Sequence, residues 1–241
     1  MRKTAICTTR PGPKSRNRNP VLSLLNVMGI VAFLAVLPIS ESIAADDSPR
    51  ADSNRHGRVT RIEEDWSIVI GTPNEREHAP QIVTVISPTS HLRDVCAIFE
   101  LNHSTLPDYL PGGMQLQLWK RGSAIGQRSF PRSGVLAIPD EKIDFTSVMR
   151  VDDRSLTFEV INGNSKTWGR FGGQSYLEHT RRTRLKDLSD YRPEASVRHS
   201  FVGYASHRVR TMVLREVRYY FADELVRRDT NPRVVHEHQP E

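Results

Sequence analysis

Aromatic and amide side chains are the residues of this sequence best suited to bind a ligand. From Met114 to Trp119 the residues alternate, with Gln115 and Gln117 between apolar neighbours, and Trp119 has the parity of the two glutamines. A sugar ring stacks its C–H face on an aromatic ring, and its hydroxyls hydrogen-bond to amide side chains. Because the apolar residues of such a strand face the core, we expect Trp119 to point outward beside the amides.

A second polar segment contains Trp168. It runs from Asn162 to Tyr176 and is interrupted by glycines, which is typical of a loop that forms the rim of a binding site. The alternative for each tryptophan is a structural role, since large aromatic side chains are mostly buried, and we interpret Trp66 in that way. The candidate ligand-binding residues are Trp119, Gln117, Trp168, Asn102, Asn162, Gln174 and Tyr176.

Acidic residues do not form a recognisable catalytic pair. Glycosidases need two carboxylates on either side of the scissile bond. Here Glu100 and Glu159 fall in separate strands, and Asp152-Asp153 falls in a turn. No Gly-x-Ser-x-Gly motif marks a nucleophilic serine. We therefore expect no catalytic residues, and a glycan-active hydrolase or lyase with an unrecognised site remains the alternative.

Metal ligands are also sparse. Glu63-Glu64-Asp65 precedes an apolar strand, and carboxylate oxygens suit calcium, although a solvated acidic strand entry has the same sequence. The nine histidines are dispersed, and His236 and His238 form an isolated His-x-His in a predicted tail. The sequence thus indicates no cofactor, with calcium as the open alternative.

Arginine is the dominant basic residue. Guanidinium groups bind sulfate and carboxylate through paired hydrogen bonds, so an anionic polysaccharide is an alternative ligand. A codon bias would produce the same excess of arginine. After residue 44, 24 of the 28 basic residues are arginine, with local groups at Arg181, Arg182, Arg184 and at Arg208, Arg210, Arg218.

Short apolar runs with a period of two dominate the chain between residues 58 and 229. Leu156, Phe158 and Val160, for example, alternate with polar residues, which predicts a half-buried antiparallel strand. Many short strands separated by turns indicate a sandwich or barrel. The only helix we expect, of one or two turns, lies within Arg181–Tyr191. Further strands are expected at Trp66–Ile70, Ile82–Ile86, Ala97–Asn102, Met114–Leu118, Gly126–Phe130, Ile143–Val151, Thr167–Phe171, Phe201–Ala205, Thr211–Phe221 and Leu225–Arg227.

Ser155–Gly163 (SLTFEVING) is similar to the strand ending in Asn-Gly or Asp-Gly in laminin-G-like members of the concanavalin A-like lectin and glucanase superfamily. Phe201–Tyr204, followed by Val213–Tyr220 (VLREVRYY), resembles the closing strands of the same domains. The resemblance implies an all-β, two-sheet antiparallel jelly-roll sandwich, concanavalin A-like, whose concave sheet binds glycans or protein partners. The laminarinase-like enzymes of the superfamily carry a Glu-x-Asp-x-x-Glu strand. That motif is absent here, so the resemblance implies binding rather than glycan cleavage.

The first 44 residues predict an export signal. Six basic residues and no acidic one in the first 20 precede an uncharged apolar run, Val27–Leu37, that is short for a membrane span. Pro38 ends the run, and Ser42-Ile43-Ala44 offers small residues for cleavage after Ala44 or one residue later. An uncleaved anchor remains the alternative. Because no Arg-Arg pair precedes the run, the general secretory route is expected.

Removal of this segment changes the charge and the cysteine content. Six of the 34 basic and one of the 28 acidic residues lie before residue 45, which leaves 28 basic against 27 acidic residues. Such a near-neutral chain argues against nucleic-acid binding. Cys96 is then the one remaining cysteine, so burial rather than an intramolecular disulfide must hold the domain together. We interpret Cys96 as a buried, inert thiol.

The sequence divides into a signal peptide (1–44), a flexible leader (45–57), one β-sandwich domain (58–229) and a disordered tail (230–241). We expect an exported, non-catalytic protein, secreted or held in the periplasm or cell envelope, that binds carbohydrate or another extracellular surface component. After signal cleavage no membrane association is expected, and the oligomeric state is left open. A structural envelope or matrix protein is a further alternative.

Overall fold

The computed structural model describes residues 57–71, 80–92, 94–101, 113–131, 136, 138–173, 176–203, 205–222 and 226–238. The chain divides into two units, residues 1–43 and 44–241, and every described residue belongs to the second unit. The predicted signal peptide, nearly all of the predicted leader, and the candidate residues Asn102 and Gln174 lie outside the described residues.

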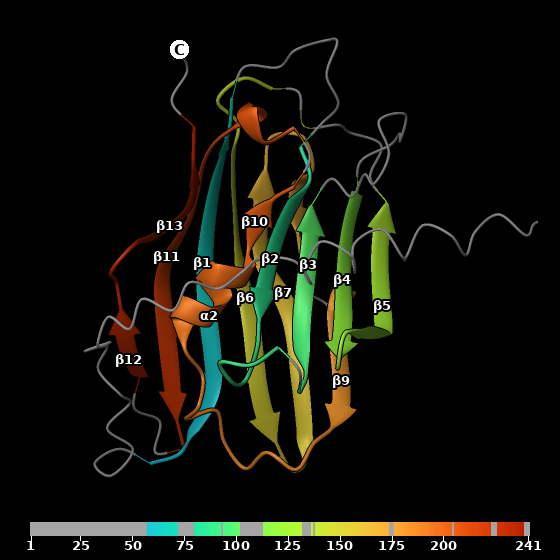
Figure 1. Cartoon of the computed structure of the whole chain (residues 1–241), viewed down its shortest axis with the longest axis vertical. Helices are drawn as coiled ribbons and strands as arrows, with labels where there is room; N and C mark the ends of the chain where they lie inside the picture. Colours follow the sequence, from blue (N-terminus) through green and yellow to red (C-terminus); the bar gives the residue numbers. More distant parts are fainter. Residues whose placement is uncertain are drawn as a thin grey trace, which may run out of the picture. The chain divides into compact units, whose positions relative to one another are not determined.

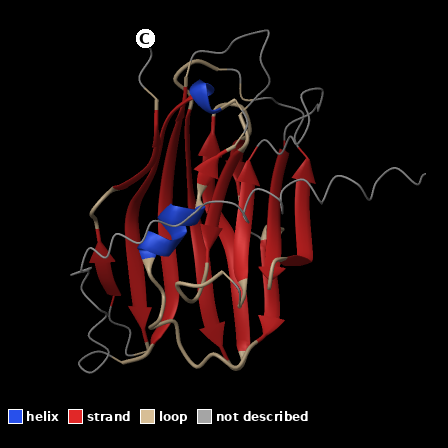
Figure 2. Ribbon diagram, viewed as in Figure 1, coloured by secondary structure: helices blue, strands red, loops and turns tan. Residues whose placement is uncertain are grey.

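The described chain forms two antiparallel sheets and a short helix, α2 (Pro193–His199), as Figures 1 and 2 show. The larger sheet has eight strands, in the order β12 (Val226–Asp229), β11 (Val209–Phe221), β1 (Val59–Ile70), β6 (Lys142–Asp152), β7 (Ser155–Ser165) and β8 (Gly169–Phe171), with β13 (Arg233–Glu237) beside β11 and β9 (Glu178–Arg182) beside β7. The smaller sheet has the order β10 (Phe201–Val202), β2 (Ile82–Ile86), β3 (Cys96–Leu101), β4 (Gly113–Lys120) and β5 (Ser123–Pro131). A 3₁₀ turn, η1 (Ser206–Arg208), precedes β11.

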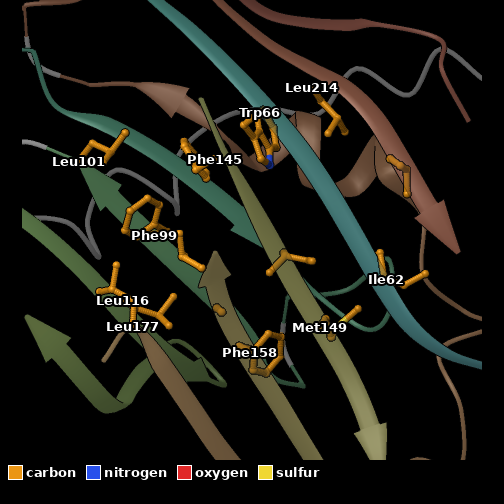
Figure 3. Packing of buried hydrophobic residues seen from close by; sticks show 14 of the residues in the cluster. Ile62, Trp66, Phe99, Leu101, Leu116, Phe145, Met149, Phe158, Leu177 and Leu214 are labelled. Atoms are coloured by element: carbon orange, nitrogen blue, oxygen red, sulfur yellow. The ribbon is translucent and has the colours of Figure 1, made fainter. Parts of the chain in front are cut away.

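Alternating apolar side chains of both sheets share one hydrophobic core. Ile62 and Trp66 of β1 and Phe99 of β3 belong to the same buried cluster, part of which Figure 3 shows. The rings of Phe99 and Phe145 meet edge to face with centroids 5.1 Å apart, which joins the smaller sheet to the larger. Burial of each large apolar side chain contributes about 1.5–3 kcal/mol. The prediction of an all-β, two-sheet antiparallel sandwich is confirmed.

A two-residue hairpin joins β6 to β7. Asp152 pairs with Ser155, and the two residues between them, Asp153 and Arg154, have φ values of 34° and 65°. Tight hairpins favour two left-handed residues because the twist of such a turn matches that of the strands. The predicted turn at Asp152-Asp153 is therefore confirmed to within one residue.

The predicted helix within Arg181–Tyr191 is wrong. Residues up to Arg182 belong to β9, and the following segment crosses to β1, where the Leu188 N–H donates to the Val59 carbonyl at 2.8 Å. The helix begins instead at Pro193, because proline has the φ of a first helical residue and holds the preceding Arg192 extended. The spacing of Leu185 and Leu188 reflects a loop packed on the core. Within the described residues no helix is long and apolar enough to cross a membrane.

The predicted tail at residues 230–241 is also wrong over much of its length. Arg233–Glu237 form β13, which pairs with β11, and the His236 ring lies 2.9 Å from the Val209 carbonyl oxygen. The alternating pattern of this segment places Val235 against the core. The edge of β11 offers unpaired backbone groups, and β13 satisfies them.

Candidate functional site

A cavity of about 660 Å³ opens on the face of the eight-stranded sheet that is turned away from the core. The alternation along β1 explains its polar character: Ile62, Trp66 and Ile68 enter the core, so Asp65 faces the other way. We call this cavity the polar cleft. Its lining comes from β1, β6, β7, β11 and the β12–β13 turn, and its polar members are Asp65, Asp144, Thr146, Asn162, Arg215, Glu216, Arg218 and Thr230.

One β-bulge in β11 shapes the cleft. Asp65 pairs with Glu216 and Trp66 pairs with Leu214, which leaves Arg215 as the extra residue of β11. A bulge bends a strand and redirects a side chain, and bulges recur next to functional sites. Arg215 is exposed and lines the cleft.

A second bulge, in β7, supplies Asn162. Between the pairs made by Asp144 and Thr146, β7 carries one residue more than β6. Asn162 has φ 55°, a left-handed conformation that asparagine tolerates better than most residues. Its side chain is exposed, lines the cleft, and lies 3.5 Å from the Thr146 hydroxyl, to which its amide donates. Two separate irregularities of the sheet thus deliver one side chain each to the same cavity.

Arg218 is held in the cleft by two carboxylates. Its Nη2 donates to Asp65 Oδ1 at 2.8 Å, its Nη1 binds Asp65 Oδ2, and its Nε donates to Glu63 Oε2 at 2.8 Å. Burial alone would lower the pKa of Arg218, but these hydrogen bonds and charges raise it. The Thr146 hydroxyl also donates to Asp65 Oδ1 at 2.7 Å, and the Tyr220 hydroxyl donates to Glu63 at 2.9 Å. The floor of the cleft is therefore a fixed, charge-compensated network.

The remaining charged groups of the cleft are less constrained. With the described residues the Arg215 guanidinium forms no ion pair or hydrogen bond. Glu216 forms ion pairs with Arg228 at 3.4 Å and Arg218 at 3.8 Å, and Asp144 pairs with Lys142 at 3.0 Å through Oδ2. The other oxygen of Asp144 is buried without a hydrogen-bond partner in the described structure. A polar ligand would meet donors on Arg215 and Asn162 and acceptors on the carboxylates.

Trp119 and Gln117 lie together on the outward face of the smaller sheet, as their parity predicted. Both are 8% exposed, and the indole Nε1–H of Trp119 donates to Gln117 Oε1 at 2.5 Å. The indole packs against Val83, Val85 and Cys96. Burial raises the pKa of the Cys96 thiol to about 12. These side chains bind one another and belong to a different sheet from the polar cleft.

The other described candidate ligand-binding residues do not lie beside Trp119 and Gln117. Trp168 belongs to the core cluster and meets Phe171 edge to face with centroids 6.3 Å apart. Tyr176 is partly buried and its hydroxyl accepts a hydrogen bond from the Gly172 N–H. Asn162 is the one described candidate that lines the polar cleft. The described candidate residues are thus spread over two sheet faces and the core.

The acidic segment Glu63-Glu64-Asp65, which was expected to precede a strand, lies inside β1 and does not act as a unit. Glu63 and Asp65 share the cleft face, where Arg218 binds both, whereas Glu64 points to the opposite face and is fully buried. The described part of the chain contains no group of three histidine, cysteine or acidic side chains arranged around a metal position. Glu100 of β3 and Glu159 of β7 lie on different sheets and form no pair.

The two predicted arginine groups are likewise divided. Arg208 is buried and donates to the Leu136 carbonyl at 3.1 Å, while Arg210 pairs with Asp140 at 2.5 Å. Arg218 lies in the polar cleft, and Arg182 belongs to β9 at the other side of the larger sheet. These four arginines therefore lie in different surroundings and do not form one basic patch.

No protein-family model matches this chain, and no curated protein matches it in sequence.

Proposed function

We propose that this protein is an exported, non-catalytic β-sandwich that binds carbohydrate in the polar cleft. The observation that carries the proposal is the convergence of two bulge residues, Asn162 and Arg215, on one polar cavity of about 660 Å³. Ligand cavities are commonly about 300–1,000 Å³, and bulges next to them are a recurrent means of aiming side chains.

The mixture of hydrogen-bonding groups favours a ligand rich in hydroxyls. Each hydroxyl donates once and accepts, so neighbouring hydroxyls of a sugar suit guanidinium donors, carboxylate acceptors and an amide that does both. Arg215, Asn162 and Glu216 supply these three kinds of group. Since Arg218 is already neutralised by Glu63 and Asp65, the cleft suits a neutral sugar better than a polyanion.

Two features of the sequence support export and the fold family. The basic segment followed by Val27–Leu37 is typical of a secretory signal. The similarity of Ser155–Gly163 and Val213–Tyr220 to laminin-G-like strands favours a concanavalin A-like jelly roll, a class that includes many glycan-binding domains. The two-sheet antiparallel sandwich is compatible with that class.

A glycan-active hydrolase is the second candidate, because Asp144 and Glu216 approach the cleft from strands on either side of β1. Two carboxylates on opposite sides of a bound sugar are the requirement of glycoside hydrolysis. Turnover of a polysaccharide panel that is lost in Asp144→Asn and Glu216→Gln would favour this reading over simple binding.

Binding of neutral oligosaccharides to the purified protein tests the proposal. We expect at least one oligosaccharide to bind, with calcium or without it, and the affinity to fall by about 5- to 100-fold in Asn162→Ala or Arg215→Ala, since each substitution removes hydrogen bonds. Arg182→Ala is the matched control, because Arg182 is exposed on the same sheet but outside the cleft. Absence of all binding, or equal loss in Arg182→Ala, would contradict the proposal.

A further inference from the structure

Helix α2 is anchored to the core through a buried carboxylate. Glu64 of β1 is fully buried, and its Oε1 accepts hydrogen bonds from the Tyr191 hydroxyl at 2.7 Å and from the Ser196 hydroxyl of α2 at 2.5 Å. Its Oε2 accepts from the Trp66 indole Nε1–H at 3.0 Å. Glu64 therefore ties the helix to a strand far away in the sequence.

The surroundings of Glu64 contain little compensating charge. Among the described residues the one cation that acts on it is Arg233 of β13, at a distance beyond an ion pair. The titratable groups nearby are Tyr191, whose hydroxyl binds Glu64, and Tyr219 of β11, whose ring lies 5.9 Å from that of Tyr191. Burial raises the pKa of both tyrosines, so neither ionises near neutral pH.

A chain of contacts leads from α2 to the rim of the polar cleft. Glu194 of α2 pairs with Arg233 at 3.2 Å, and Arg233 donates to Asp229 at 2.7 Å. Arg233 also donates to the Asn231 carbonyl at 3.1 Å, and the Asn231 N–H donates to Asp229 at 3.1 Å. Arg233 thereby fixes the β12–β13 turn. Two residues of that turn, Thr230 and Pro232, line the cleft.

We propose that α2 is a pH-responsive support of the polar cleft. Protonation of Glu64 stabilises the docked position of α2, and the Glu194–Arg233 pair then holds the β12–β13 turn in place. The idea rests on the proposed function only in treating the cleft as the ligand site.

The hydrogen-bond pattern around Glu64 accommodates the proton. The two groups that bind Oε1 are hydroxyls, which can reverse and accept, whereas the indole N–H at Oε2 can only donate. When one hydroxyl accepts the proton on Oε1, the other can still donate to that oxygen, and the indole keeps its bond to Oε2. Glu64→Gln reproduces the neutral charge of the protonated form, with its amide nitrogen in the place of Oε1 as a donor to both hydroxyls and its amide oxygen accepting from the indole.

The direction of the response follows from linkage. Burial, which outweighs the hydrogen bonds and the charge of Arg233, raises the pKa of Glu64 from 4.5 to about 7 in the docked state. When α2 opens and water reaches the carboxyl, its pKa returns toward the ordinary value, so the docked state binds the proton more tightly. Acidification through pH 7 favours docking, and alkaline pH favours opening.

Amide hydrogen exchange of the purified full chain tests the first step. After correction for intrinsic rates, the Glu64 contribution to opening at the amides of Ala195 in α2 and of Ser200, its C-cap, should be a rise of roughly 70-fold from pH 5 to pH 8.5, the ratio given by the two pKa values. In Glu64→Gln the same amides should lose that rise and keep only the response of opposite sign expected from His199 at the end of α2, whose pKa burial lowers. Glu100→Gln is the matched control, a buried carboxyl of β3 away from α2, and should retain the full response. A rise that persists in Glu64→Gln, or is absent from the unaltered chain, would overturn the proposal.

The link from α2 through Glu194 and Arg233 to the β12–β13 turn, here called the relay, is tested separately with Glu194→Gln. The pH response of α2 should remain, while the Asn231 amide of the β12–β13 turn should lose it. If the Asn231 amide never follows α2, the relay is wrong even though the helix responds. None of these measurements uses a sugar, so failure of carbohydrate binding and failure of this proposal are distinguishable.

Discussion

Glu64→Gln should remove a pH-dependent loss of global stability. A carboxyl whose pKa is about 7 in the folded chain and 4.5 when unfolded binds protons more tightly in the folded state, so its contribution is greatest at low pH and is lost as pH rises through 7. Between pH 5 and pH 8.5 the unaltered chain should lose about 2–3 kcal/mol from this group. Urea unfolding followed by tryptophan fluorescence measures it, since Trp66 is a direct partner of Glu64.

The quantity to compare is the difference in unfolding free energy between Glu64→Gln and the unaltered chain at each pH, because histidines and surface carboxyls titrate equally in both. The unfolding free energy of the variant minus that of the unaltered chain should increase by about 2–3 kcal/mol from pH 5 to pH 8.5. A difference that stays constant over that range would refute the burial argument, and one that changes in the opposite direction would show that the hydrogen bonds outweigh burial.

Three further outcomes are expected. Arg218→Ala should destabilise the fold by about 2–4 kcal/mol in chemical unfolding, because it leaves the partly buried carboxylates of Glu63 and Asp65 without their cation. An unchanged midpoint would show that water can replace the guanidinium in this network. Gly172→Ala should lower the free energy of unfolding more than Gly173→Ala. Both glycines have positive φ, but a Cβ at Gly172 would lie 2.6 Å from a backbone oxygen, whereas no atom of the described residues lies within 4 Å of one at Gly173; equal unfolding midpoints would contradict this. Cys96 should stay unmodified by iodoacetamide in the folded chain at pH 8, and rapid alkylation would show that its burial is incomplete.

The alternation of apolar residues was sufficient to predict most of the strands, but not β9, β13 or the first half of β1. Met114, Leu116 and Leu118 enter the core and Trp119 faces away from it, as a period of two requires. Local pattern was less informative where tertiary contacts decide the structure. The Leu185 and Leu188 spacing resembles a helix, yet proline places the helix start at Pro193.

The polar cleft was not predicted because its parts are far apart in the sequence. Asp65, Thr146, Asn162 and Glu216 come together through the register of four strands, and register is not visible in one strand alone. Two signals were present: the alternation of Glu63 and Asp65 with core residues, and an Asn-Gly pair inside a strand, which suggests a bulge. The predicted ligand-binding residues instead included aromatic ones, of which Trp168 lies in the core.

Chemical-shift mapping with a bound neutral oligosaccharide tests the central claim most directly. The backbone amides perturbed on saturation should cluster at Asp65, Thr146, Asn162 and Arg215, around the polar cleft. Perturbations centred on Trp119 and the amides beside it would place the binding site on the other sheet and contradict the account.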